Sequence, residues 1–182
     1  WRPQQGRVAR LYCDIRYADG RPFDIDGRRV LRDAVKRLDA QSLKCKVGLE
    51  CEFYLFTLDE AGRPTQTPHD QAGYLDFAPL DKGENVRREV CLSLEQMGIQ
   101  PVSSHHEGGP GQNEVGLMAT SPLAAADNYV TFTNVVRTVA ARYGLFASFL
   151  PKPLAQKNGS GLHLSMSLFR GTENVFLENG SL

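Results

Sequence analysis

Two glutamates separated by one residue, Glu50 and Glu52, stand in the segment GLECEFYLF at residues 48–56. The alternation along this segment predicts a β-strand with an apolar face and an opposite face that carries both glutamates and Tyr54. At a rise of about 3.3 Å per residue, the two carboxylates lie about 6–7 Å apart. Like charges this close need a balancing cation, although a solvated edge strand would carry the same pattern.

A second candidate is the segment SHHEGGPGQNE at residues 104–114. Glu107 and Glu114 bracket a tight Gly/Pro loop that is expected to join two strands. Mg²⁺ and Mn²⁺ take carboxylate oxygens at about 2.1 Å, so these glutamates and Glu52 together indicate a divalent-cation site. The alternative is a polar hairpin with two unrelated glutamates. Neighbouring strand residues point to opposite sides, so at most one of His105 and His106 serves the same ion.

The third candidate, NGSGLHLSMSL at residues 158–168, predicts a strand with His163, Ser165 and Ser167 on its polar face. Its apolar face consists of Leu162, Leu164, Met166 and Leu168. Imidazole can complete a site whose other ligands are carboxylates, whereas a hydrogen-bonded structural histidine is the alternative. The Asn158-Gly159 pair also fits a two-residue hairpin turn. Together the three segments predict a metal-dependent carboxylate site, with phosphoryl transfer favoured over hydrolysis.

The elements that must position these residues alternate irregularly between strands and helices, which favours an α+β fold with an antiparallel sheet flanked by helices. Strands are predicted over residues 8–15, 48–56, 102–106, 113–118, 145–150 and 161–168. Apolar spacing and terminal glycines predict helices over residues 28–38, 84–97 and 124–143. A turn at 18–22 and a polar loop over 59–73 complete the prediction.

The composition excludes some classes of function. The 182 residues carry 21 basic and 21 acidic side chains, so their formal net charge is zero, which argues against a nucleic-acid or membrane-surface partner. No apolar run is long enough to span a bilayer. The four cysteines, without a C-x-x-C pair, are expected to be reduced thiols, mostly in the core, of a cytoplasmic protein. The start at Trp1 leads us to expect a piece of a longer protein.

Four motifs in this order resemble the glutamine synthetase family, most closely its bacterial type I enzymes: GLECEFYLF (48–56), GYLDFAPLDKGENVRRE (73–89), SHHEGGPGQNE (104–114) and FLPKPLAQKNGSGLH (149–163). The resemblance implies ATP-dependent ligation of ammonia to L-glutamate through γ-glutamyl phosphate, giving glutamine, ADP and phosphate. It implies two or three Mg²⁺ or Mn²⁺ ions. It also implies a homo-oligomer, a dodecamer of two stacked rings, in which a neighbouring subunit completes the active site.

The same resemblance implies that residues 1–182 are the N-terminal part of a catalytic domain, and that residues 1–10 are the junction from a small N-terminal domain. The remaining C-terminal part would lie outside this chain. The isolated fragment is therefore expected to be inactive.

The resemblance also implies roles for individual residues. By matched position, the first metal would be held by Glu52, Glu107 and Glu114, and the second by Glu50 and His163. The positions that bind substrate glutamate are matched by Asn158 and Gly159. The nucleotide-contacting positions are matched by Val102, Ser165 and Ser167.

The sequence departs from the family pattern beside the nucleotide positions. Residues 115–119 read VGLMA, where relatives continue with an acidic, a basic and an aromatic residue. Thr133 replaces a usual basic residue, and Ser165 a usual His or Asn. These changes leave two alternatives: a γ-glutamyl ligase that uses another amine, and a non-catalytic assembly subunit. The five retained ligand positions favour a ligase.

Overall fold

A computed structural model of the chain describes residues 9–177, which divide into two compact units. The larger unit comprises residues 48–118 and 128–164. The smaller comprises the described residues among 1–47, 119–127 and 165–182. The predicted junction at 1–10 lies outside the described residues, except for residues 9 and 10.

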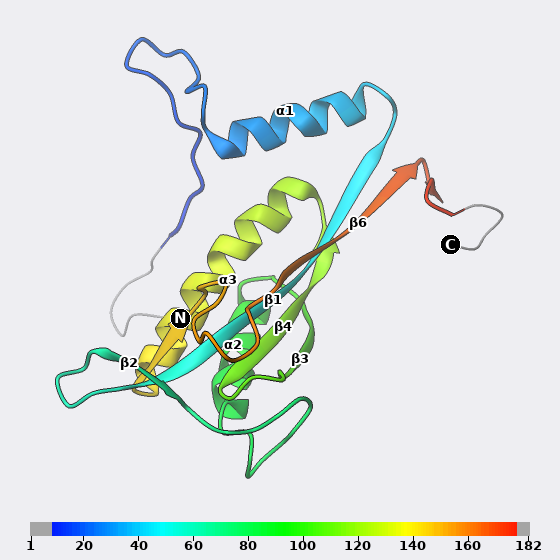
Figure 1. Cartoon of the computed structure of the whole chain (residues 1–182). Coiled ribbons are helices and arrows are strands. Elements are labelled where there is room, and N and C mark those ends of the chain that lie inside the picture. The colour runs from blue at the N-terminus through cyan, green and yellow to red at the C-terminus, as the bar shows by residue number, and fades with distance from the viewer. Residues whose placement is uncertain (1–8, 178–182) are drawn as a thin grey trace. The chain divides into compact units, whose positions relative to one another are not determined.

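The sheet of the larger unit is built on β1 (Lys44–Leu58) (Figure 1). The strands follow the order β3 (Pro101–His106), β4 (Gln112–Thr120), β1 and β6 (Leu162–Arg170). Two further strands, β2 (Pro64–Pro68) and β5 (Leu145–Ser148), pair antiparallel with β1. The pair β3–β4 is also antiparallel, and the predicted α+β class is confirmed.

The apolar face of β1 forms the core of the larger unit, as its alternation predicts. Leu49, Cys51, Phe53 and Leu55 are all buried. The Phe53 ring meets Phe132 of α3 (Pro122–Arg142) edge-on, with 6.1 Å between ring centroids. Each fully buried large apolar side chain contributes about 1.5–3 kcal/mol of transfer free energy. These contacts fix which face of β1 is left for polar side chains.

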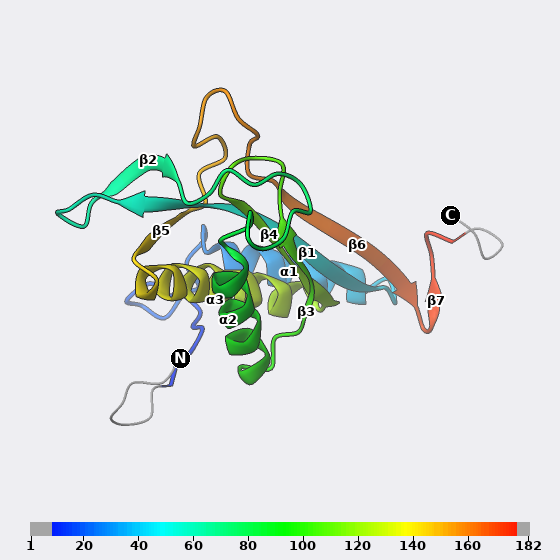
Figure 2. The same ribbon diagram turned by 90° about the horizontal axis from the view of Figure 1, so that it is seen from below.

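Helix α2 (Glu84–Gln96) covers the same unit and begins at the predicted residue. Val86, Val90 and Leu94 are buried, and Gly98 closes the helix with a φ of +77°. Figure 2 shows α2 and α3 on one side of the strands and the loop at residues 151–161 on the other. The polar face of β1 is thus left to the loops.

A buried ion pair fixes α2 to the β3–β4 hairpin. The Arg87 guanidinium binds both carboxylate oxygens of Asp81, at 2.6 and 3.1 Å, and donates to Asn113 Oδ1 at 2.6 Å. All three residues are buried. Because Asn113 precedes Glu114 on β4, this network fixes the hairpin from its helix side.

In the smaller unit, α1 (Gly27–Asp39) forms where a helix is predicted, and Asp26 caps it by accepting from the N–H of Arg28. None of the helix's residues is buried, so the prediction of an apolar packing face is not met. Ion pairs hold the helix instead. Arg28 binds Asp14 and Asp127, and Arg32 binds Asp14.

Several predicted elements are wrong or incomplete. The strand predicted at 8–15 is absent over residues 9–15, which lead instead into an isolated bridge between Arg16 and Pro22. The predicted loop at 59–73 contains the short strand β2. It was not predicted because prolines, which are unfavourable in strands except at edges, stand at both of its ends. The short β7 (Glu173–Asn174) was also missed.

Two predictions of burial are also wrong. The apolar residues Leu162, Leu164 and Met166 of β6 are exposed by 45, 57 and 62%. Cys13, expected in the core, is exposed, although all four cysteines are free thiols as predicted. Across residues 9–177, no helix combines the length and apolar character needed to cross a membrane.

The buried ion pair predicts a large difference between two neighbouring arginines of α2. Arg87→Met leaves the Asp81 carboxylate buried without its partner, and we expect a loss of about 3–5 kcal/mol of unfolding free energy. Arg88→Met is the matched control, because Arg88 forms an exposed pair with Glu84, and it is expected to cost less than about 1 kcal/mol. Equal losses in chemical denaturation would contradict the assignment.

Candidate functional site

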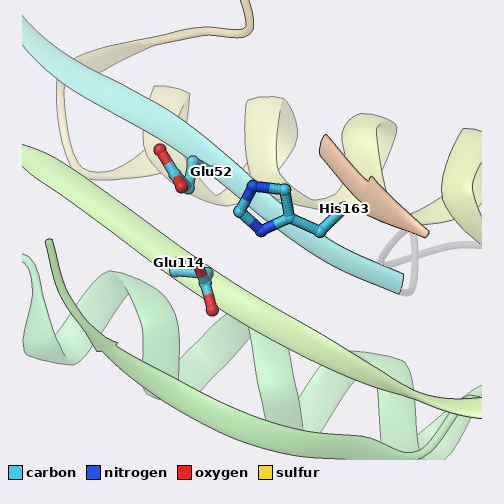
Figure 3. Close-up of side chains that lie close together, drawn as sticks. All are labelled: Glu52, Glu114 and His163. Carbon is cyan, nitrogen blue, oxygen red and sulfur yellow. The ribbon is translucent and has the colours of Figure 1, made fainter. Parts of the chain in front are cut away.

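Three strands bring Glu52, Glu114 and His163 together on the polar face of the sheet (Figure 3). Glu52 comes from β1, Glu114 from β4 and His163 from β6. One ligand atom from each lies within 4.8 Å of the others. Residues 111 positions apart in the sequence therefore contribute donor atoms to one small volume.

A second group on the same face consists of His105, Glu107 and Glu114. His105 Nδ1 is 3.5 Å from a Glu107 oxygen, and Nε2 is 3.4 Å from a Glu114 oxygen. His105 is directly opposite Glu114 in the hairpin register. Sequence reasoning admitted one histidine of the pair without choosing it, and the pairing register selects His105.

The remaining predicted ligand, Glu50, lies at the open edge of the site. Its carboxylate is 3.4 Å from His163 Nδ1, and the two side chains are 50 and 62% exposed. The side chains of Glu107 and Glu114 are only 16 and 11% exposed. The structure thus brings together all five predicted ligands through shared neighbours, and Glu114 belongs to both groups.

The site is crowded with negative charge. Burial first, and then the carboxylates of Glu107, Glu50 and Glu52, raise the pKa of Glu114, while His105 lowers it. Among the described residues, no lysine or arginine pairs with any of these four glutamates. The basic side chains within 4 Å of three of them are histidines, which carry a charge only when protonated. This environment favours a bound cation.

The donor atoms fit a hard divalent ion. Carboxylate oxygens and a neutral imidazole are suitable ligands for Mg²⁺ or Mn²⁺. Ligand atoms around an octahedral ion with bonds near 2.1 Å are about 3–4.2 Å apart. In each group found here the donor atoms lie within 4.8 Å of one another, which is close to that spacing.

His106, the other histidine of the pair, points away from the site into a buried ion pair. Its Nε2 lies 3.0 Å from Asp70, and its Nδ1 donates to the Glu107 carbonyl at 2.6 Å. Burial would raise the pKa of Asp70, but hydrogen bonds from His106 and the Gly111 N–H hold it at about 2. Burial alone would lower the pKa of His106, but the Asp70 carboxylate raises it above its usual value. The pair fixes the loop between Glu107 and Glu114.

Asp81 lies close enough to Asp70 and His106 to form a third acidic group. The Arg87 guanidinium already occupies the Asp81 carboxylate. We therefore assign this group to the scaffold of the hairpin.

The loop at 158–161 is held against this face through its backbone. Tyr54 donates to the Asn158 carbonyl at 2.7 Å, and Gln112 Nε2 donates to the Gly159 carbonyl at 2.9 Å. The Gly161 N–H donates to Glu52 at 2.9 Å. Asn158 and Gly159 are themselves exposed. They do not form the two-residue hairpin turn considered from the sequence, because β5 and β6 each pair with β1.

The remaining predicted residues, the nucleotide positions, are not part of this cluster of donor atoms. Val102 is 59% exposed on β3. Ser165 and Ser167 lie in the part of β6 that belongs to the smaller unit. The predicted metal ligands and the 158–161 loop thus lie together in one unit. The assignment of the nucleotide positions still depends on the sequence resemblance alone.

These features define the class of protein: an α+β domain with a carboxylate-rich candidate cation site on an antiparallel sheet. The profile of the family described as "Glutamine synthetase, catalytic domain" matches residues 24–181. The chain belongs to the glutamine synthetase family.

Curated relatives agree with this assignment. The chain is 51% identical over 180 residues to a glutamine synthetase of Clostridium saccharobutylicum, and 47% identical over 178 residues to one of Methanosarcina mazei. Each alignment covers 98% of this chain and 40% of the relative. The chain therefore spans about 40% of the length of these relatives.

Solved structures share the fold. Plasmodium falciparum glutamine synthetase matches with a TM-score of 0.80 at 24% identity, over 92% of this chain and 38% of that protein. A GmaS–ADP complex matches with a TM-score of 0.80 at 31% identity, over 92% of this chain and 39% of that protein. The resemblance to glutamine synthetase and the fold class are both confirmed.

The close contacts around the hairpin loop predict that a side chain at position 109 would destabilise the fold. A Cβ at Gly109 would lie 2.1 Å from the Tyr54 hydroxyl and 2.7 Å from Gln112 Oε1. Gly109→Ala is therefore expected to lower the melting temperature by several degrees, as overpacking of about 1–3 kcal/mol would. Gly27→Ala, where a Cβ has no neighbour within 4 Å, is the control. Equal melting temperatures for the two variants would refute the close packing.

Proposed function

We propose that the protein containing this chain ligates ammonia to L-glutamate with ATP, through γ-glutamyl phosphate, and releases glutamine, ADP and phosphate. The observation that carries the proposal is the convergence of Glu52, Glu114 and His163 from three strands. Membership of the glutamine synthetase family supplies the reaction class. The GmaS–ADP complex is a structural neighbour with a bound nucleotide product.

In this proposal, two or three Mg²⁺ or Mn²⁺ ions bind on the polar face of β1. Glu52, Glu107 and Glu114 hold the first ion, and Glu50 and His163 contribute to the second. Bound there, the ions neutralise the phosphates and orient the substrate carboxylate. Donor atoms of Glu52 and Glu114, from the first set, lie within 4.8 Å of one of His163, from the second, which supports two neighbouring ions.

The chain's own groups then position the substrates. Asn158 and Gly159 bind L-glutamate, largely through a backbone that is held by Tyr54 and Gln112. Ser160 Oγ in this loop is the buried side-chain polar atom without a hydrogen-bond partner among the described residues, which favours a polar ligand nearby. Val102, Ser165 and Ser167 contact the nucleotide.

The apolar segment at 115–119 motivates a second candidate within the same class, a γ-glutamyl ligase that uses another amine. Val115 and Leu117 are buried, so part of this segment serves the core. A non-catalytic assembly subunit is the third candidate. It has no reason to retain like-charged glutamates that lack lysine or arginine partners, so we favour the ligase.

We propose further that residues 1–182 are the N-terminal part of a catalytic domain and that residues 1–10 join it to a small preceding domain. The 40% coverage of the curated relatives is compatible with such further parts of the protein. The complete protein would form a homo-oligomer, a dodecamer, whose neighbouring subunits complete each site. Its free thiols suit the cytoplasm.

The metal assignment is tested by Mn²⁺ titration of the full-length protein without substrates. Glu52→Ala and His163→Ala each remove a donor, and we expect each to weaken Mn²⁺ binding about tenfold or more. Glu60→Ala, a glutamate in the exposed turn after β1, is the matched control. Titration curves of both site variants that coincide with the control curve would overturn the assignment.

The reaction is tested by phosphate release from the full-length protein with ATP, L-glutamate and Mg²⁺, with ammonia or a panel of primary amines. We expect release that depends on both glutamate and amine, and fastest with ammonia. Faster release with another amine would select the second candidate. The absence of turnover with every amine would refute the ligase, and we expect the isolated 182-residue chain to be inactive.

A further inference from the structure

Two buried polar side chains outside the predicted ligand set, Tyr54 and Gln112, lie between the metal ligands and the 158–161 loop. Tyr54 is fully buried and Gln112 is 1% exposed. Tyr54 is 58 positions from Gln112 and 104 from Asn158 in the sequence. Buried polar groups are costly unless they are fully hydrogen-bonded, so their partners indicate what they do.

The Gln112 side-chain amide is satisfied at both ends. Its Nε2 donates to Glu52 Oε2 at 2.6 Å and to the Gly159 carbonyl at 2.9 Å. Its Oε1 accepts from the Gly109 N–H at 2.8 Å. The two acceptors on one side and the N–H donor on the other determine which amide atom is oxygen. One side chain thus joins a metal ligand to the substrate loop and to the turn of the β3–β4 hairpin.

The Tyr54 hydroxyl completes the junction. It donates to the Asn158 carbonyl at 2.7 Å and lies 3.2 Å from Gln112 Oε1. Within residues 9–177 the Tyr54 hydroxyl makes no hydrogen bond to a predicted metal ligand, so its direct effect is on the loop.

Glycines leave the room that this arrangement requires. A Cβ at Gly109 would collide with the Tyr54 hydroxyl, and a Cβ at Gly108 would lie 2.6 Å from Asn158 Nδ2. A Cβ at Gly161 would lie 2.8 Å from Glu52 Oε1. The hairpin turn and the loop approach the polar face of β1 as closely as backbone allows.

We infer that Gln112 and Tyr54 are positioning residues: Gln112 orients the Glu52 carboxylate and holds the 158–161 loop beside it, and Tyr54 fixes that loop alone. The part of the inference that concerns glutamate binding by the loop rests on the proposed function. The part that concerns the contact between Gln112 and Glu52 does not. It predicts that the two residues affect different measurements. Gln112 affects metal and substrate binding, and Tyr54 affects substrate binding only.

The role of Gln112 is tested by titrating the full-length protein with Mn²⁺ in the absence of substrate. The electron paramagnetic resonance signal of the free ion measures how much Mn²⁺ is bound. Gln112→Met keeps the volume and removes the donor to Glu52, and we expect a loss of affinity of about tenfold. Val136→Ala is the control for general destabilisation, because Val136 is fully buried on α3, and it should lower the melting temperature with unchanged Mn²⁺ affinity. Mn²⁺ affinity of Gln112→Met within twofold of the wild type would overturn this half.

The Tyr54 half is tested with Tyr54→Phe, which removes one oxygen and keeps the ring. We expect Mn²⁺ affinity within twofold of the wild type and a KM for glutamate raised about fivefold or more with kcat nearly unchanged, because one hydrogen bond to the loop is lost. Tyr129→Phe, a half-buried tyrosine of α3, is the matched control. An unchanged KM for Tyr54→Phe, or a loss of Mn²⁺ affinity, would overturn this half.

The two readouts separate this inference from the proposed function. If the wild type has no turnover, the proposed function fails, whereas Mn²⁺ binding still decides the Gln112 contact and the Tyr54 role falls with the function. If Gln112→Met does not fold, Tyr54→Phe decides whether the junction positions the loop. If turnover is normal and neither variant differs from its control, the junction is structural only and the inference is wrong.

Discussion

The proximity of like-charged carboxylates on one face of a β-sheet is the constraint on which the rest of this structure depends. Glu50, Glu52, Glu107 and Glu114 lie around one volume, and the basic side chains within 4 Å of three of them, among the described residues, are histidines. Bringing these carboxylates together on folding costs electrostatic free energy, and a bound cation offsets that cost. The glutamine synthetase family, to which the chain belongs, offers a chemistry for that cation.

Contacts outside the cluster hold each segment that carries a candidate ligand in place against this repulsion. The apolar face of β1 packs on α3, so Glu50 and Glu52 must project from the opposite face. The Asp81–Arg87 ion pair and the Asp70–His106 ion pair hold the hairpin that carries Glu107 and Glu114. Buried pairs of this kind add little net stability, but breaking one is costly. They specify geometry, which a site of repelling charges needs most.

Local sequence pattern was sufficient to bring the candidate ligands to notice, because each stands in a short segment, and the structure places them near one another. Alternation in residues 48–56 places Glu50 and Glu52 on one face, and the Gly/Pro loop brings Glu107 and Glu114 to its two ends. Gln112 and Tyr54 escaped prediction because their partners lie far away in the sequence. Alternation marked Tyr54 only as polar-facing, whereas the loop that buries it is set by the tertiary fold. Likewise, the apolar spacing of α1 predicted the helix correctly but not its exposure.

The most direct measurement is anomalous X-ray diffraction at the manganese edge from crystals of the full-length protein grown with Mn²⁺. We predict two neighbouring anomalous peaks per subunit on the polar face of β1, one contacting Glu52, Glu107 and Glu114, and the other contacting Glu50 and His163. The absence of peaks on this face, or Mn²⁺ bound only elsewhere, would show that the clustered carboxylates are not a metal site.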